Sequence, residues 1–131
     1  MDCPFCPPAL NPENIVLVNA HCLFILKHET VLIGSGLIVP KAHRVNVFEL
    51  SVEEWASMYS LLHEVKQLLD QKFAPQGYNL GWNSGQVAGQ EVFHAHLHVI
   101  PRYADEPLAG KGIRYWLKQT MNSRVQGHRQ G

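Results

Sequence analysis

Three histidines alternate with apolar residues in one short segment, His94-Ala95-His96-Leu97-His98. Side chains of a β-strand point alternately to its two faces, so a strand here places the imidazoles about 6–7 Å apart along one face. Ala95 and Leu97 then face the other side, where they can join an apolar core. A row of buried imidazoles without partners costs free energy, and one sheet face offers few partners. The segment therefore predicts a strand that carries a functional site.

From the residues alone, this row is compatible with two kinds of chemistry. His-x-His on a strand commonly presents two imidazoles to a metal ion. Alternatively, one imidazole is a nucleophile and its neighbours tune it. The preceding segment, Asn83-x-Gly85-x-x-x-Gly89-Gln90, favours the second, because glycines let backbone amides approach an anion closely. His96, which has an imidazole on each side, is then the natural nucleophile for attack at a phosphorus atom.

A second candidate site lies near the start of the chain. Cys3-Pro4-Phe5-Cys6 has the C-x-x-C spacing of half a zinc site, although two free thiols on an arm fit the same residues. The chain has three cysteines, and an odd count makes a poor disulfide framework.

Charge and length limit the possible partners. Eleven Lys and Arg balance eleven Asp and Glu, so no global field attracts a nucleic acid polymer or an anionic membrane. No apolar run reaches the roughly 18–20 residues of a membrane span, and no signal peptide is recognisable, so we expect a cytoplasmic protein. A chain of 131 residues predicts one domain over 1–131, with an irregular arm at 1–14 and a tail at 102–131.

The clearest predicted element is a helix that begins after Ser51 and ends near Phe73. Ser51 and Glu54 have the spacing of a capping box. Apolar residues then recur at spacings of three and four, which predicts one stripe that packs on a core. The stripe consists of Trp55, Met58, Leu62, Val65 and Leu69.

The predicted strands surround this helix in the sequence. They cover residues 15–19, 22–27 and 37–39 before the helix, and 78–82 and 92–100 after it, with Pro40 and Pro101 closing two of them. The order β-β-β-α-β-β predicts an α+β fold, with an antiparallel five-stranded sheet and the long helix packed on one face.

Together these motifs resemble the histidine triad (HIT) family of nucleotide hydrolases and transferases. The resemblance rests on His-x-His-x-His followed by two hydrophobic residues, and on Gly-Gln-x-hydrophobic-x before it. Pro40-Lys41-x-His43 after a predicted strand and the N-terminal C-x-x-C of many bacterial members agree with it. The matching landmarks extend over about residues 3–101.

The resemblance implies a mechanism and a substrate class. His96 would attack the α-phosphorus of a dinucleoside polyphosphate, such as diadenosine tetraphosphate, or of a nucleoside phosphoramidate. Water would then cleave the nucleotidyl-histidine. His98 would contact the α-phosphate, while Asn83, Gln90 and the amides of the loop that ends at Gly89 would bind phosphate oxygens or the leaving group. This scheme requires no catalytic metal.

The resemblance also implies a structural zinc ion and a homodimer. In members with the N-terminal C-x-x-C, the ligands correspond to Cys3, Cys6, His43 and His94 here, a closed set of two thiolates and two imidazoles. Lys27 departs from the family pattern, because many members bind the ribose hydroxyls with an acidic residue or Asn at this place. Lys27 is either an ordinary exposed lysine or a contact for a longer anionic substrate.

Two other functions remain open from the sequence. The chain could be a nucleotide-binding or scaffold protein with little turnover. It could also be a zinc-dependent hydrolase in which the histidine row supplies the metal ligands, and chelation would then abolish its activity.

Overall fold

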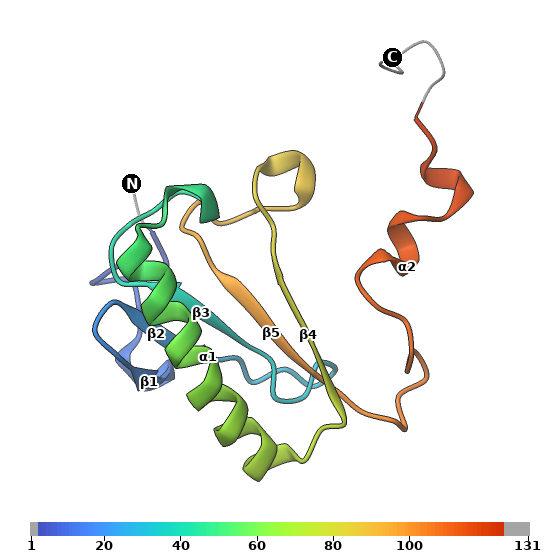
Figure 1. Ribbon diagram of the computed structural model, residues 1–131, viewed down its shortest axis with the longest axis horizontal. Helices are drawn as coiled ribbons and strands as arrows, with labels where there is room; N and C mark the ends of the chain where they lie inside the picture. Colours follow the sequence, from blue (N-terminus) through green and yellow to red (C-terminus); the bar gives the residue numbers. More distant parts are fainter. Residues whose placement is uncertain (1–2, 125–131) are drawn as a thin grey trace.

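The computed structural model describes residues 3–124 and contains one five-stranded antiparallel sheet with a long helix on one face (Figure 1). The strand order is β1-β2-β3-β5-β4, and the predicted α+β fold is confirmed. The elements are β1 (Ile15–Val18), β2 (Cys22–Leu26), β3 (Gly36–Pro40), α1 (Val52–Phe73), β4 (Gly77–Trp82), β5 (Leu97–Arg102) and α2 (Arg114–Leu117), with short 3-10 turns at Pro12–Asn14, Val47–Glu49, Gln86–Ala88 and Thr120–Asn122.

Helix α1 begins and ends where the sequence predicts. The Ser51 side chain accepts a hydrogen bond from the Glu54 amide, and the Glu54 carboxylate accepts one from the Ser51 amide, so the capping box is present. At the other end, Ala74 adopts a left-handed conformation with φ 51°, which stops the helix after Phe73.

The buried stripe of α1 differs from the predicted one at two positions. Leu61 is fully buried, whereas Trp55 is 47% exposed and Leu62 is only half-buried. The helix meets the sheet along Met58, Leu61, Val65 and Leu69. Trp55 lies off this line and contacts the ring of Trp82 at the edge of the sheet, with ring centroids 5.9 Å apart. The predicted core position of Trp55 is therefore wrong, because Glu54, which is 3% exposed, is the residue of this turn that faces inward.

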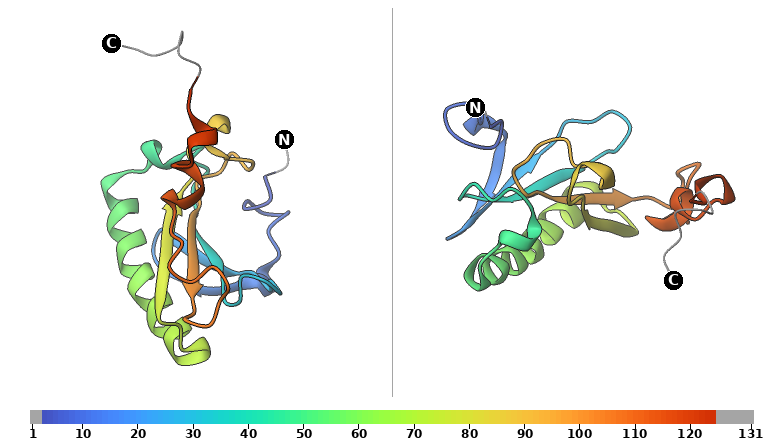
Figure 2. Two further views of the ribbon diagram at one scale, coloured as in Figure 1. Left: turned by 90° about the vertical axis from the view of Figure 1, so that its right-hand side faces the viewer. Right: turned by 90° about the horizontal axis from the view of Figure 1, so that it is seen from above.

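The sheet separates two apolar clusters. The larger cluster packs between α1 and the sheet, and its strand residues are Cys22, Phe24, Leu26, Ile38, Leu97 and Val99. The smaller cluster is on the opposite face, where the N-terminal arm (residues 3–14) covers Ile25, Leu37 and Val39 with Phe5 and Leu10. Figure 2 shows the arm and α1 on opposite sides of the sheet.

Strand β5 is shifted along the chain relative to the prediction. It begins at Leu97 rather than near residue 92, because the paired part of β4 ends at Trp82, which is the partner of Leu97. Pro101 lies inside the strand and does not close it. Beyond Val99, β5 has only β4 as a neighbour, and a proline is tolerated there because one side needs no donor.

The C-terminal segment leaves the sheet after Arg102 (Figure 1). The Arg102 guanidinium donates to the carbonyl oxygens of Leu108 and Lys111, and thereby fixes the turn that follows the strand. Within the expected tail, Arg114–Leu117 forms the short helix α2. Residues 1–2 of the expected arm and 125–131 of the expected tail lie outside the described residues. No helix within residues 3–124 has the length and apolar character needed to span a bilayer.

Candidate functional site

His96 lies at the end of the irregular segment before β5 and lines a cavity of about 400 Å³. Its Nδ1 is 2.8 Å from the main-chain oxygen of His94. A carbonyl oxygen only accepts, so Nδ1 carries the hydrogen and donates it. The lone pair is therefore on Nε2, and this tautomer leaves a nucleophilic nitrogen available.

His98 is in β5 itself, paired with Leu37 of β3, and lines the same cavity. Its ring centroid is 5.0 Å from that of His96. Burial, and then the charges of His96 and Lys27, hold the pKa of His98 below its ordinary value. Its Nε2 is buried and has no hydrogen-bond partner among the described residues. The neutral His98 ring thus has an unused polar atom near the nucleophile.

Other cavity walls come from several parts of the fold, including Leu37 of β3 and Ile100 of β5. Asn83 and Gly89 belong to the loop after β4, Lys27 follows β2, and Phe5 belongs to the N-terminal arm. The structure therefore brings the predicted residues Asn83 and Gly89 to the same cavity as His96.

Gln90 is 2% exposed and is not a wall of this cavity. Its side-chain oxygen accepts from the Gly85 amide at 2.8 Å, and its nitrogen donates to the main-chain oxygens of Val45 and Val92. The Gln90 side chain thus lies inside the loop. It connects the two ends of residues 85–90 to each other and connects this loop to the neighbouring segment 41–50.

Several backbone amides of this loop already donate hydrogen bonds within the loop. The amides of Ala88 and Gly89 donate to the main-chain oxygens of Gly85 and Gln86. Gly85 and Gly89 have φ angles of 93° and 99°, in the region that favours glycine. The segment expected to present free amides to a phosphate is instead a compact 3-10 turn, because these amides donate hydrogen bonds to carbonyl oxygens of the same segment.

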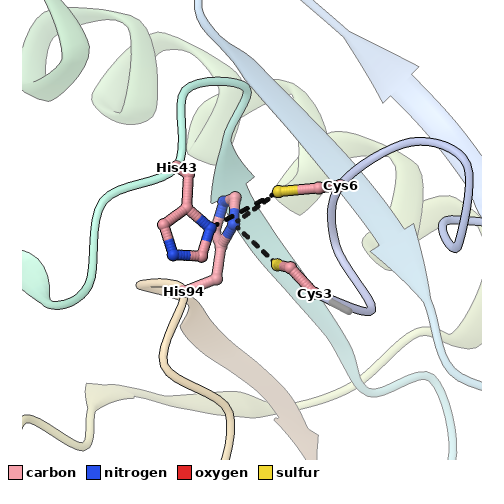
Figure 3. Close-up of side chains that lie close together, drawn as sticks. All are labelled: Cys3, Cys6, His43 and His94. Carbon is pink, nitrogen blue, oxygen red and sulfur yellow. Dashed lines mark hydrogen bonds between the residues drawn. The ribbon is translucent and has the colours of Figure 1, made fainter. Parts of the chain in front are cut away.

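Four predicted ligands form a second site beside the first (Figure 3). The ligand atoms of Cys3, Cys6, His43 and His94 all lie within 4.8 Å of one another. His94 Nδ1 is 3.3 Å from Cys3 Sγ and 3.5 Å from Cys6 Sγ, and His43 Nδ1 is 3.4 Å from Cys6 Sγ. Residues far apart in the sequence thus converge through the arm, the loop after β3 and the segment before β5.

The geometry of this cluster fits a tetrahedral zinc ion. Zinc–ligand bonds of about 2.3 Å to sulfur and 2.0–2.1 Å to nitrogen place neighbouring S and N atoms about 3.5–3.6 Å apart. His94 Nε2 donates to the Pro40 carbonyl oxygen at 2.8 Å, so its Nδ1 lone pair faces the thiols. Burial and the neighbouring Cys3 raise the pKa of Cys6 to about 11 in the absence of a cation. A bound metal reverses this effect, because it stabilises the thiolate.

Two residues at the site were not indicated by their own sequence pattern. Phe5 contacts the rings of both His94 and His96, with centroids 5.8 Å and 5.4 Å away. The main-chain oxygen of Arg44 accepts from the Ala95 amide at 2.7 Å and so holds the segment between the two histidines. Phe5 could have been found from its position inside the C-x-x-C motif, whereas no sequence pattern pointed to Arg44.

A family model described as HIT domain matches residues 9–105 of this chain. The chain belongs to the HIT family. Among its relatives, Protein hit from Bacillus subtilis is 35% identical over 104 residues, which cover 78% of this chain and 72% of that protein. A crystal structure of a HIT family member from Bacillus subtilis superimposes with a TM-score of 0.71 at 34% identity, covering 80% of this chain and 76% of the other.

Other relatives have names that state an activity or a metal. The adenosine 5'-monophosphoramidase hnt1 of Schizosaccharomyces pombe is 35% identical over 60% of this chain and 56% of that protein. The asymmetrical bis(5'-nucleosyl)-tetraphosphatase of the same organism is 31% identical over 55% of this chain and 40% of its own length. A Zn-bound histidine triad protein from Mycobacterium smegmatis has a TM-score of 0.64 at 29% identity, covering 73% of this chain and 70% of its own.

Proposed function

We propose that this protein is a nucleotide hydrolase or transferase that acts through a covalent nucleotidyl-histidine on His96. The observation that carries the proposal is the hydrogen bond from His96 Nδ1 to the His94 carbonyl oxygen, in a ring that lines a cavity of about 400 Å³. The named activities of hnt1 and of the tetraphosphatase, both on nucleotide conjugates, support the same substrate class.

In the proposed reaction, the lone pair of His96 Nε2 forms a bond to the α-phosphorus of a nucleotide conjugate. The bond from phosphorus to the leaving group breaks, and the leaving group departs with that electron pair and takes up a proton. Water then attacks the same phosphorus and releases a proton to solvent, which balances the proton that the leaving group took from solvent. The N–P bond breaks with its electrons returning to Nε2, and a nucleoside monophosphate is released. Dinucleoside polyphosphates and nucleoside phosphoramidates both fit this scheme.

His98 and the loop after β4 act on the phosphate in this proposal. The unpartnered Nε2 of His98 hydrogen-bonds a phosphate oxygen and stabilises the charge that develops in the transition state. The Asn83 side-chain amide donates to another phosphate oxygen, and Gly89, whose own amide is already bonded within the loop, lines the cavity beside it without a side chain that would exclude the phosphate. Gln90 positions this loop through its bonds to Gly85 and Val45.

The test is the intact mass of the protein after brief incubation with adenylated substrates. An alkaline quench is needed, because a phosphorus–nitrogen bond to histidine is labile in acid. We expect a nucleotidyl adduct on the wild-type chain and none on His96→Ala. Product release without any adduct, abolished by a chelator, would support the zinc-dependent hydrolase instead. Tight nucleotide binding with neither adduct nor turnover would support the binding or scaffold protein.

We further propose that Cys3, Cys6, His43 and His94 hold a structural zinc ion. The Cys2His2 donor set and the tetrahedral spacing support it, as does the Zn-bound neighbour of known structure. When bound, such an ion supplies a cross-link and no open position for substrate. His94 then positions the His96 ring through its carbonyl oxygen, and takes no part in proton transfer.

We also propose a homodimer formed through the β4 edge. Within residues 3–124, strand β4 has a neighbouring strand on one side only. Beside it lies a mainly apolar groove of about 390 Å³ lined by Tyr59, Leu62, His63, Lys66, Tyr78, Leu80 and Val99. Open strand edges pair readily with a second copy. We expect Leu80→Glu to give a monomer by light scattering at low micromolar concentration. Val16→Glu is the control, because Val16 is on the opposite edge strand and is as exposed as Leu80, at 41% and 40%. A wild-type monomer would contradict this proposal.

A further inference from the structure

Phe5 connects the metal cluster to the catalytic cavity. It stands between the two thiol ligands Cys3 and Cys6 in the sequence. Its ring centroid is 5.4 Å from that of His96 and 5.8 Å from that of His94. A displacement of the arm therefore moves the Phe5 ring relative to the nucleophile.

Phe5 is also a wall of two adjoining cavities. The first is the cavity of about 400 Å³ that contains His96 and His98. The second, of about 270 Å³, lies between the arm and the end of β2. Phe5 and Lys27 line both, and Leu10 and Ile25 line the second. The shared wall at Phe5 gives a ligand that is larger than a phosphate group and held at His96 a route past this ring toward the second cavity.

The arm that carries Phe5 is attached to the sheet through side chains. In the described part of the chain, the main-chain hydrogen bonds of residues 3–14 remain within the arm, as from Cys6 to Cys3 and from Leu10 to Cys6. Its attachments are the packing of Phe5 and Leu10 on the sheet and the sulfur–imidazole contacts of the cluster. The sulfur–imidazole contacts are thus among the few interactions that position the Phe5 ring on the sheet.

We propose that Phe5 is a substrate-binding residue whose position is set by the metal centre, so that zinc binding and nucleotide binding are coupled through this ring. This inference rests on the proposed function, and it assigns to Phe5 the contact with the nucleoside part of the substrate. An aromatic face stacks on a base without a charge requirement, and a ring already fixed in place costs less entropy on binding. The four-ligand site then contributes to substrate binding and also cross-links the arm to the rest of the fold.

The experiment measures equilibrium binding of AMP to the full-length chain with and without zinc. For the wild-type protein, we expect zinc removal to weaken AMP binding by about 5–150-fold, the usual range of coupling between two sites. By reciprocity, saturating AMP must tighten zinc binding by the same factor, which competition with a chromophoric chelator measures. For Phe5→Ala, we expect weaker AMP binding in the zinc form and less than about a twofold further effect of zinc removal.

Control variants separate the ring from the fold. Phe5→Leu retains apolar bulk on the sheet, so it should bind one zinc per chain and still lose most of the coupling. Phe48→Ala removes an exposed phenylalanine outside both cavities and should behave as the wild type. Equal AMP affinity of the zinc-loaded and zinc-free wild type, or full coupling retained in Phe5→Leu, would overturn the inference. AMP binding involves no covalent step, so this experiment can fail or succeed independently of the adduct experiment with His96→Ala.

Discussion

At the scale of single residues, the two cavity histidines differ in what their ring nitrogens contact. His96 has one nitrogen fixed by the His94 carbonyl oxygen, which leaves the other as a nucleophile. His98 has a buried Nε2 with no protein partner within residues 3–124. A buried polar atom without a partner costs free energy, so a site of this kind is completed by its ligand.

His98→Ala should slow the formation of the nucleotidyl adduct on His96 by about 10²–10³-fold, the usual loss when one transition-state donor is removed. The fold should remain, since His98 makes no hydrogen bond through Nε2 within the described chain. Single-turnover kinetics by quenched-flow mass spectrometry measures the rate. His21→Ala is the matched control, because His21 is exposed between β1 and β2 and does not line this cavity. An unchanged rate in His98→Ala would remove His98 from the mechanism.

At the scale of elements, one ion pair connects the start of α1 to the segment before β5 that carries His94 and His96. Glu54 is 3% exposed and accepts from Arg44 Nε at 3.0 Å while it caps the helix. Arg44 in turn accepts from the Ala95 amide through its main-chain oxygen. A local capping motif thereby contributes to the position of the segment that carries His94 and His96.

Glu54→Ala should lower the free energy of unfolding by about 1–3 kcal/mol, because it removes the capping acceptor and leaves Arg44 without its carboxylate. Glu53→Ala, an exposed change in the same helical turn, should stay within about 0.5 kcal/mol of the wild type. Urea unfolding at pH 7 measures both. Equal stability of the two variants would show that the ion pair contributes little.

The same carboxylate should make stability depend on pH. Burial opposes the charge on Glu54, but the Ser51 amide and the Arg44 guanidinium outweigh it and hold the pKa of that carboxyl below its usual value. The unfolded chain therefore binds this proton first, and the Glu54 contribution is complete above the ordinary Glu pKa of about 4.3. It is lost as the pH falls through the lowered pKa. Urea midpoints between pH 7 and pH 3 should fall less steeply for Glu54→Gln than for Glu53→Gln.

At the scale of the whole molecule, the sheet has α1 on one face and the arm on the other (Figure 2). The cavity that contains His96 and His98 is also lined by Phe5 of the arm. The large core stabilises the helix side. The smaller cluster on the site side depends on an arm that has no strand pairing of its own. A cross-link at the four-ligand site therefore stabilises the face on which the reaction is proposed to occur.

Cys3→Ser should remove bound zinc and lower the melting temperature by about 10 °C or more, since a ligand that binds only the folded chain stabilises it by mass action. Elemental analysis of protein purified without chelator measures the metal. Cys22→Ala is the control, because Cys22 is buried in the large core away from the cluster. That variant should lose stability yet retain one zinc per chain. A wild-type protein free of zinc would contradict the metal proposal.

The sequence by itself determined the features that a few neighbouring residues encode. The capping box and the apolar spacing were enough to place α1. Short β-prone runs between turn residues were enough to place β1 to β4 and the order of all the strands along the chain, but the predicted start of β5 is wrong. The histidine row and the C-x-x-C pair identified the chemistry-bearing residues. Each of these depends on hydrogen bonds or periodicities that span only a few positions.

Only the tertiary structure decided what distant segments do together. Cys3 and His94 are 91 positions apart, and their contact exists because the arm packs on the sheet face over β2 and β3. The start of β5 follows from the end of its partner β4, and the interior position of Gln90 follows from the packing of its loop on Val45. Phe5 becomes a cavity wall for the same reason: pairing and packing over long separations are set by the whole sheet, and no local pattern records them.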